Sequence, residues 1–232
     1  MAVVVDGLRF AAALLAAGVL LAGCGRSVAL SVVTSLPPPV VARLPLEMGV
    51  HYGQVFRERT YAEDSKDRPD WHIDTRQARR TLFDTVLPAM FERVIEVPQP
   101  RAPADTAIDA ILEPVPVDLQ LAVPGETGAE FYEAWVKFRI RLLDPGGQLL
   151  AEWDLAGYGR QRSNGSVGVE PENLNAAIDN AYRDLGARLV LGFRKQAAVA
   201  DWLCRHPRVS VAALPAATGD GVPVACQPSV GG

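Results

Sequence analysis

The clearest structural signal in this chain is a pair of alternating segments on either side of a tight turn. In the first segment, apolar side chains occupy every second position: Val136, Phe138, Ile140 and Leu142. After the turn at residues 144–147 (DPGG), the second segment repeats the pattern: Leu149, Ala151, Trp153 and Leu155. A period of two predicts a β-hairpin with one apolar face. The other face carries bases on one strand and acids on its neighbour, as cross-strand charge pairs would.

The segment before this hairpin predicts a strand followed by a helix. Residues 44–52 (LPLEMGVHY) form the first strand candidate. Asp74, with Gln77 three residues later, is a helix-start signal of the capping-box type. Apolar residues then recur at helical spacing: Leu82, Phe83, Val86, Leu87, Met90, Phe91, Val94 and Ile95. Pro88 falls inside this pattern, so we expect it to kink or split the helix.

Two further elements complete the expected body. Residues 111–123 predict a second strand, and Pro114 and Pro116 favour a sheet edge or a bulge for its first half. Pro171 opens a second helix at a position where proline is tolerated, and its apolar face extends to Phe193. The order is β-α-β-β-β-α. It predicts an α+β fold, with a mainly antiparallel sheet and two helices packed on one face.

The N-terminus predicts export and a lipid anchor. A short apolar core over residues 10–21 precedes the run Leu21-Ala22-Gly23-Cys24. The core is shorter than the roughly 20 residues of a membrane span and suits a cleaved signal peptide. This run resembles the lipobox of bacterial lipoprotein precursors. The resemblance implies cleavage between Gly23 and Cys24 and acylation of Cys24. A plain signal peptide or an uncleaved anchor with a chance cysteine are the alternatives.

The predicted organisation has four parts. Residues 1–23 are the lipoprotein signal peptide, and residues 24–43, with the triplet Pro37–Pro39, are a Pro-rich tether. Residues 44–203 are the α+β domain, and residues 204–232 are a Pro/Ala/Gly-rich C-terminal tail. Acylation of Cys24 leaves Cys204 and Cys226 as an even pair in an oxidising compartment, so we predict a disulfide bond between them.

Composition and motifs give no reason to expect catalysis, a cofactor, a metal or nucleic acid. The net charge of −4 offers no general basic character for nucleic acid. None of the three histidines, His51, His72 and His206, lies in a metal-binding pair. No nucleophile elbow, phosphate-binding loop or dinucleotide fingerprint is present. We therefore expect a protein that is not an enzyme, although a catalytic carboxylate pair assembled only in space would be invisible in sequence.

Two groups of residues are candidates for binding. Lys137, Arg139 and Arg141 project from one sheet face, where they could contact an anion or a lipid head group. The alternative is simple pairing with Glu152 and Asp154. Tyr61 and Trp71 belong to an aromatic, charged segment that could contact a partner. The alternative for Trp71 is that it packs under the start of the first helix.

In element order the chain resembles small envelope lipoproteins of Gram-negative bacteria. It is similar to the auxiliary lipoproteins of ABC-type lipid transporters and to the lipoprotein that plugs the lipopolysaccharide translocon. Gly25 after the cysteine implies, by the sorting habit of enteric lipoproteins, the periplasmic face of the outer membrane. The resemblance implies an accessory protein, anchored to the membrane by its N-terminal lipid, that supports envelope assembly or transport by contacting an envelope protein. A lipid- or glycan-binding module is the alternative.

Overall fold

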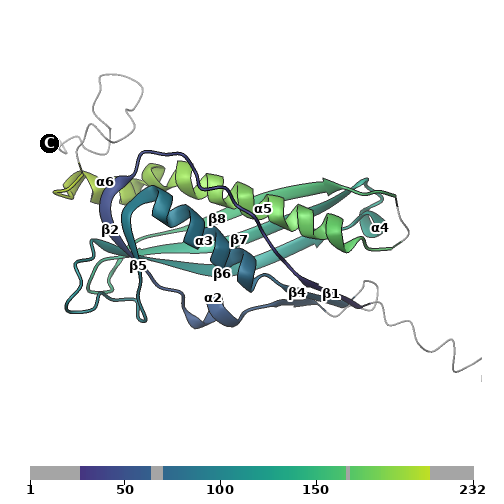
Figure 1. Ribbon diagram of the computed structural model, residues 1–232, viewed down its shortest axis with the longest axis horizontal. Helices are drawn as coiled ribbons and strands as arrows, with labels where there is room; N and C mark the ends of the chain where they lie inside the picture. The colour runs from purple at the N-terminus through teal and green to yellow at the C-terminus, as the bar shows by residue number, and fades with distance from the viewer. Residues whose placement is uncertain (1–26, 64–69, 166–167, 210–232) are drawn as a thin grey trace, which may run out of the picture.

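The computed structural model describes residues 27–63, 70–165 and 168–209, and within them the chain has the predicted α+β architecture (Figure 1). The strands are β1 (Ser27–Ser31), β2 (Leu44–Val50), β3 (Tyr61–Glu63), β4 (Asp70–Asp74), β5 (Phe91–Glu96), β6 (Ala110–Ala122), β7 (Phe131–Leu143) and β8 (Leu149–Arg162). The helices are α2 (Gln54–Glu58), α3 (Arg76–Met90), α4 (Pro124–Thr127), α5 (Pro171–Gly192) and α6 (Ala197–Arg205), with a short 3₁₀ turn, η1 (Phe193–Lys195).

The main body is a five-stranded sheet in the order β5-β2-β6-β7-β8. The β6–β7 and β7–β8 pairs are antiparallel, whereas β2 pairs in parallel with both β5 and β6. The predicted hairpin is confirmed, and the inward side chains of β7, from Val136 to Leu142, are buried. Helices α3 and α5 lie on the same side of the sheet (Figure 1), as predicted. A smaller sheet, in the order β1-β4-β3, adjoins this body.

The first helix ends earlier than its apolar pattern predicts. Helix α3 is continuous from Arg76 to Met90, so Pro88 lies in its last turn and does not split it. Val94 and Ile95 belong instead to β5, where they pair with β2. Both residues are β-branched and suit a strand, and their spacing continued the helical pattern across the junction. The sequence has no clear stop signal between Met90 and Phe91, so the apolar pattern alone could not show where the helix ends and the strand begins.

Strand β6 shows how its two prolines are accommodated. Only residues 110–112 of β6 pair with β2, whereas residues 111–122 pair with β7. Pro114 and Pro116 therefore lie where β6 has a strand partner on one side only. The register with β7 also shifts between Pro116 and Asp118. Both expectations, an edge and a bulge, are confirmed, because proline cannot donate to a second ladder.

Part of the predicted tether is packed onto the body. Residues 27–31 form β1, which pairs in parallel with β4. Val32 is fully buried, and its amide donates to the carbonyl oxygen of Asp74 at 2.8 Å. The hydroxyl of Thr34 then donates to Asp179 on α5. In Figure 1 the chain from β1 to β2 crosses in front of α5. The alternating apolar residues of this segment, not its prolines, decide where it lies.

Helix α5 sits very close to β8 because two glycines of that strand face it. A methyl group at Gly157 would lie 2.2 Å from the carbonyl oxygen of Ala181. One at Gly159 would lie 2.2 Å from the carbonyl oxygen of Ala177 and equally close to the amide nitrogen of Ala181. These neighbours are main-chain atoms of a helix, so they cannot move aside singly. The two glycines therefore set the distance between helix and sheet.

We expect Gly159→Ala to lower the free energy of unfolding by at least about 2 kcal/mol, because the added methyl group would force α5 away from the sheet. Gly192→Ala is the matched control, since a methyl group there meets nothing within 4 Å. That control should change stability by less than about 1 kcal/mol. Urea unfolding measures both. Equal stability of Gly159→Ala and the wild-type protein would contradict the close contact.

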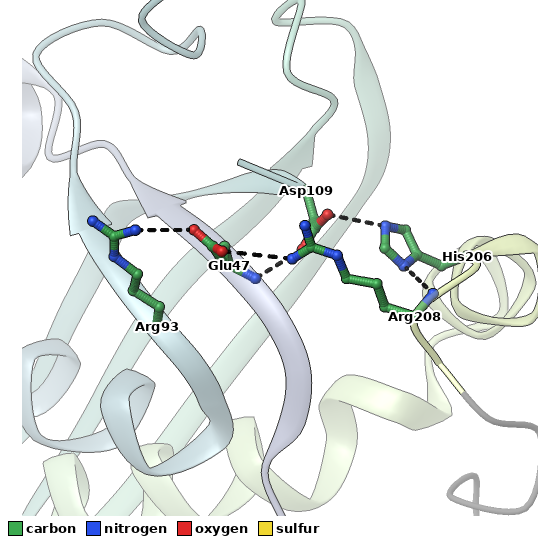
Figure 2. A network of polar contacts seen from close by, with 5 residues as sticks. All are labelled: Glu47, Arg93, Asp109, His206 and Arg208. Atoms are coloured by element: carbon green, nitrogen blue, oxygen red, sulfur yellow. Dashed lines mark hydrogen bonds and ion pairs between the residues drawn. The ribbon is translucent and has the colours of Figure 1, made fainter. Parts of the chain in front are cut away.

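An alternating network of acids and bases holds the segment after α6 to the sheet (Figure 2). Asp109 Oδ2 accepts from the amide of Glu47 at 2.8 Å and lies 3.3 Å from Arg208 Nη1. Asp109 Oδ1 lies 3.3 Å from His206 Nε2. Arg208 also reaches Glu47 at 3.6 Å, which Arg93 contacts from β5 at 3.2 Å. The first residues of the predicted C-terminal tail are thus bound to β2 and to the start of β6.

We expect Asp109→Ala to lower the free energy of unfolding by about 1–3 kcal/mol, because it removes the carboxylate that accepts from the Glu47 amide together with the contacts to His206 and Arg208. Glu130→Ala is the control. Its pair with Arg162 is exposed, so its loss should cost less than about 0.5 kcal/mol. Thermal unfolding followed by circular dichroism compares the two. Equal losses would show that the network contributes no more than a surface pair.

Candidate functional site

The three bases predicted on the outer sheet face are all paired with acids. Lys137 Nζ lies 2.8 Å from Asp154 Oδ2, and Arg139 Nε lies 3.0 Å from Asp154 Oδ1. Arg141 Nε lies 3.4 Å from Glu152 Oε2. Hydrogen bonds from Lys137 and Arg139 hold the pKa of the Asp154 carboxyl below its usual value. The structure therefore shows the alternative, in which these bases pair with acids of the neighbouring strand. Lys137, Arg139 and Arg141 thus present no uncompensated positive charge to an anion.

The two aromatic candidates, Tyr61 and Trp71, have different environments. Trp71 is 0 % exposed and belongs to the main hydrophobic core, so a partner contact by this residue does not fit the structure. The alternation of β4 explains this: Trp71 and Ile73 point inward, whereas His72 is exposed. Tyr61, on the neighbouring strand β3, is half-buried and lines a cavity. Only Tyr61 therefore remains near an accessible site.

The predicted lipid site and signal cleavage site, Gly23 and Cys24, lie outside the described residues, as does Cys226. Cys204, near the end of α6, is disulfide-bonded. Its partner lies outside the described residues. The pairing of Cys204 with Cys226 therefore stays a prediction.

A cavity of about 200 Å³ lies between the five-stranded sheet, the start of α3 and the segment that connects α2 to β3. Its ionisable and hydroxyl-bearing lining includes Arg59, Tyr61, Thr75, Arg79, Asp118 and Tyr182. Its apolar wall includes Leu119, Val136 and Phe138. The cavity is found where β2 no longer pairs with β6 and where β6 bulges. The interrupted strand leaves room that a continuous sheet would fill.

Arg79 is the unusual residue of this cavity. It is 1 % exposed, and its guanidinium carbon lies 5.5 Å from the centre of the Phe56 ring. Nη1 donates to the hydroxyl oxygen of Thr75 at 3.3 Å. Nε and Nη2 are buried without a hydrogen-bond partner among the described residues. These two nitrogens form one edge of the guanidinium fork, the edge that can bind a carboxylate or phosphate group with two parallel hydrogen bonds.

The other charged groups of the cavity have partners. The Asp118 carboxylate accepts from the Leu119 amide at 2.9 Å and from Gln120 Nε2 at 2.8 Å. Arg59 Nη1 donates to the carbonyl oxygen of Pro116 at 3.1 Å. Arg59 and Arg79 against Asp118 leave one positive charge in excess in the lining. The cavity thus has the charge balance of a site for a monoanion.

Burial shapes the protonation of the cavity wall. It lowers the pKa of the Arg79 guanidinium, because the charged form loses its hydration. An arginine nevertheless keeps its charge in proteins. Burial also raises the pKa of Tyr182 to about 12, so its hydroxyl group stays protonated at neutral pH. The site therefore offers a fixed cation beside neutral hydroxyl groups.

The sequence analysis missed Arg79, although a signal for it was present. Arg79 precedes Leu82, Phe83 and Val86 by three, four and seven residues. These are the spacings of one helix face, so the residue lies on the buried side of the predicted helix. An arginine on that side requires either a partner or a ligand. The cavity beside this arginine is not visible in sequence, because it depends on five separate elements, β3, α3, β6, β7 and α5.

Within residues 27–63, 70–165 and 168–209, no group of three or more His, Cys, Asp or Glu residues is placed to hold a metal ion. Over the same residues, none of the helices combines the length and the apolar character that crossing a membrane requires.

Neither a protein-family model nor a curated protein matches this chain. Solved structures resemble it in part. A Xanthomonas campestris protein of the family called DUF330 has a TM-score of 0.46 and 12 % identity, covering 71 % of this chain and 93 % of its own. A candidate lipoprotein from Caulobacter crescentus has a TM-score of 0.33 and 15 % identity, and the match covers 54 % of this chain and 79 % of the other. A hypothetical protein from Chlamydia trachomatis has a TM-score of 0.38 and 12 % identity, and the match covers 67 % of this chain and 98 % of the other. At these values nothing about function follows from the likenesses.

We expect Arg79→Met to leave the free energy of unfolding unchanged or to raise it by about 1 kcal/mol, because it removes a buried charge that has no ionic partner in the part of the chain that the structure describes. Arg80→Met is the control on the same helix. Arg80 pairs with Asp84 and Glu96, so its replacement should lower stability by about 1 kcal/mol. Urea unfolding of the ligand-free protein separates the two. A loss of about 2 kcal/mol for Arg79→Met would show that the guanidinium is already stabilised.

Proposed function

We propose that this protein is a non-enzymatic, lipid-anchored accessory protein on the periplasmic face of the outer membrane. It supports assembly or transport of envelope components by contacting an envelope protein. The lipobox-like run from Leu21 to Cys24 supports the anchor. One acyl chain binds a membrane only marginally, and the diacylglyceryl and N-acyl groups of lipoproteins meet the need for more than one.

An aromatic patch on the outer sheet face carries the proposed protein contact. We define this patch as Phe131, Trp135 and Tyr158, which lie on the face opposite α5 by the register of β7 and β8. Trp135 is 38 % exposed, and its ring centre lies 5.2 Å from that of Tyr158. The guanidinium carbon of Arg160 lies 4.9 Å from the ring centre of Phe131. Trp, Tyr and Arg are the residues most enriched at interface centres.

The surroundings of the aromatic patch also resemble an interface. The paired charges of Lys137, Arg139 and Asp154 continue along the same face. An apolar centre beside a polar, charge-compensated surface is the usual arrangement of a protein contact. Covering an unpaired charge with a neutral surface would remove its hydration without compensation, whereas a charge that already has an ionic partner keeps that partner. The expected partner therefore presents an apolar surface with few uncompensated charges.

Trp135→Ala tests the contact in the full-length protein purified from detergent-solubilised membranes. We expect the wild-type protein to elute as a complex of fixed stoichiometry, and Trp135→Ala to weaken that complex at least tenfold. Leu191→Ala on α5 is the control, since Leu191 is also exposed but lies outside the patch. Light scattering with size-exclusion chromatography gives the masses. A wild-type protein that is strictly monomeric, or a complex unaffected by Trp135→Ala, would refute this contact.

A further inference from the structure

The cavity at Arg79 has a feature that the proposed protein contact does not use. Arg79, which is 1 % exposed, lines the cavity, and two of its donors are buried without acceptors among the described residues. We propose that this cavity binds a monoanionic group, a carboxylate or a phosphodiester, through the Nε and Nη2 edge of Arg79. Both groups carry two acceptor oxygen atoms on one central atom, which can accept the two hydrogen bonds of this edge. This inference is independent of the aromatic patch, which lies on the other face of the sheet.

The geometry of the guanidinium favours two-pronged binding. Thr75 occupies Nη1, and the Phe56 ring contacts the guanidinium at 5.5 Å without using its hydrogen-bond donors. These two contacts fix the orientation of the group. The remaining edge is the one that matches a planar carboxylate or two phosphate oxygens. Thr75 also occupies the N-cap position of α3, without a side-chain capping hydrogen bond, so the positive end of this helix dipole lies on the same side.

The charge of the cavity limits the ligand to one negative charge. Arg59 and Arg79 supply two positive charges, and Asp118 supplies one negative charge. A monoanion neutralises the lining, whereas a dianion would meet repulsion from Asp118. The site should therefore prefer a carboxylate or a phosphodiester to inorganic phosphate, which carries between one and two charges at neutral pH.

Size and lining define the rest of the ligand. The volume of about 200 Å³ is below the roughly 300–1,000 Å³ of pockets for drug-sized ligands. Only a head group with a few carbon atoms fits inside. Leu119, Val136 and Phe138 provide an apolar wall for those carbons. The ligand class is thus a short organic acid, or the head group of a larger molecule whose remainder stays outside.

Calorimetric titration of the full-length protein in a non-ionic detergent tests this proposal with three probes. Hexanoate represents a carboxylate, glycerophosphoglycerol represents the phosphodiester of a lipid head group, and inorganic phosphate represents the free ion. We expect hexanoate or glycerophosphoglycerol to bind at one site at least tenfold more tightly than inorganic phosphate. The tighter of the two identifies the source of the anion. Failure of both to bind, or a preference for inorganic phosphate, would overturn the proposal.

Variants link the binding to the guanidinium edge. Arg79→Met should weaken binding at least tenfold, and Arg79→Lys should weaken it several-fold because a lysine keeps the charge but loses the fork. Arg80→Met is the control and should stay within about twofold of the wild-type protein. Binding that is equal in the wild-type protein and Arg79→Met would overturn the assignment.

A measurement on the wild-type protein covers the case in which Arg79→Met does not fold. The ¹⁵N–¹H resonance of Arg79 Nε, assigned by its absence in Arg79→Lys, should shift on addition of the tighter probe. The proton should also exchange more slowly with water, because it becomes hydrogen-bonded to the anion. An unchanged Nε resonance at saturating probe would overturn the proposal.

Discussion

The close approach of α5 to β8 is the contact on which the rest of the structure depends. Gly157 and Gly159 let the helix main chain lie directly against the strand, where any larger residue would collide with Ala177 or Ala181. This fixed distance places Leu185 and Leu189 in the core and brings α5 against α3. It also places Tyr182, the residue after Ala181, in the cavity wall. The position of the candidate site therefore follows from two missing side chains on a strand that does not itself line it.

Charged side chains have different surroundings on the two faces of the sheet. On the outer face, bases and acids form exposed pairs, which contribute little to stability because water screens them. Inside, Arg79 is buried without an ionic partner among the described residues, and an uncompensated buried charge costs far more. Stability alone does not explain an arginine at that position, because an apolar residue would fill the same space at lower cost. A ligand that supplies the missing oxygen atoms offsets the cost.

Local patterns predicted the elements better than their contacts. The hairpin from Val136 to Leu155 was predictable because its alternation and its turn lie within one short segment. The prolines of β6 likewise predicted an edge and a bulge, since their effect is local. The strand β5 and the packing of β1 were missed, because short apolar segments fit several partners and only the assembled sheet selects one. The burial of Arg79 was implied by helical spacing, whereas its cavity required five elements to meet.

The position of β1 bears on where the cavity would lie if Cys24 carries the proposed lipid anchor. Cys24 precedes Ser27 by three residues, which span at most about 11 Å. Lipidation at Cys24 would therefore hold the start of β1 close to the bilayer surface, in place of the long tether that the prolines suggested. Strand β1 then pairs with β4, and Val32 bonds to Asp74 directly before Thr75, which lines the cavity. A site at the end of so short a connection would lie within reach of lipid head groups, and the phosphodiester is the anion that such a surface presents at the highest local concentration.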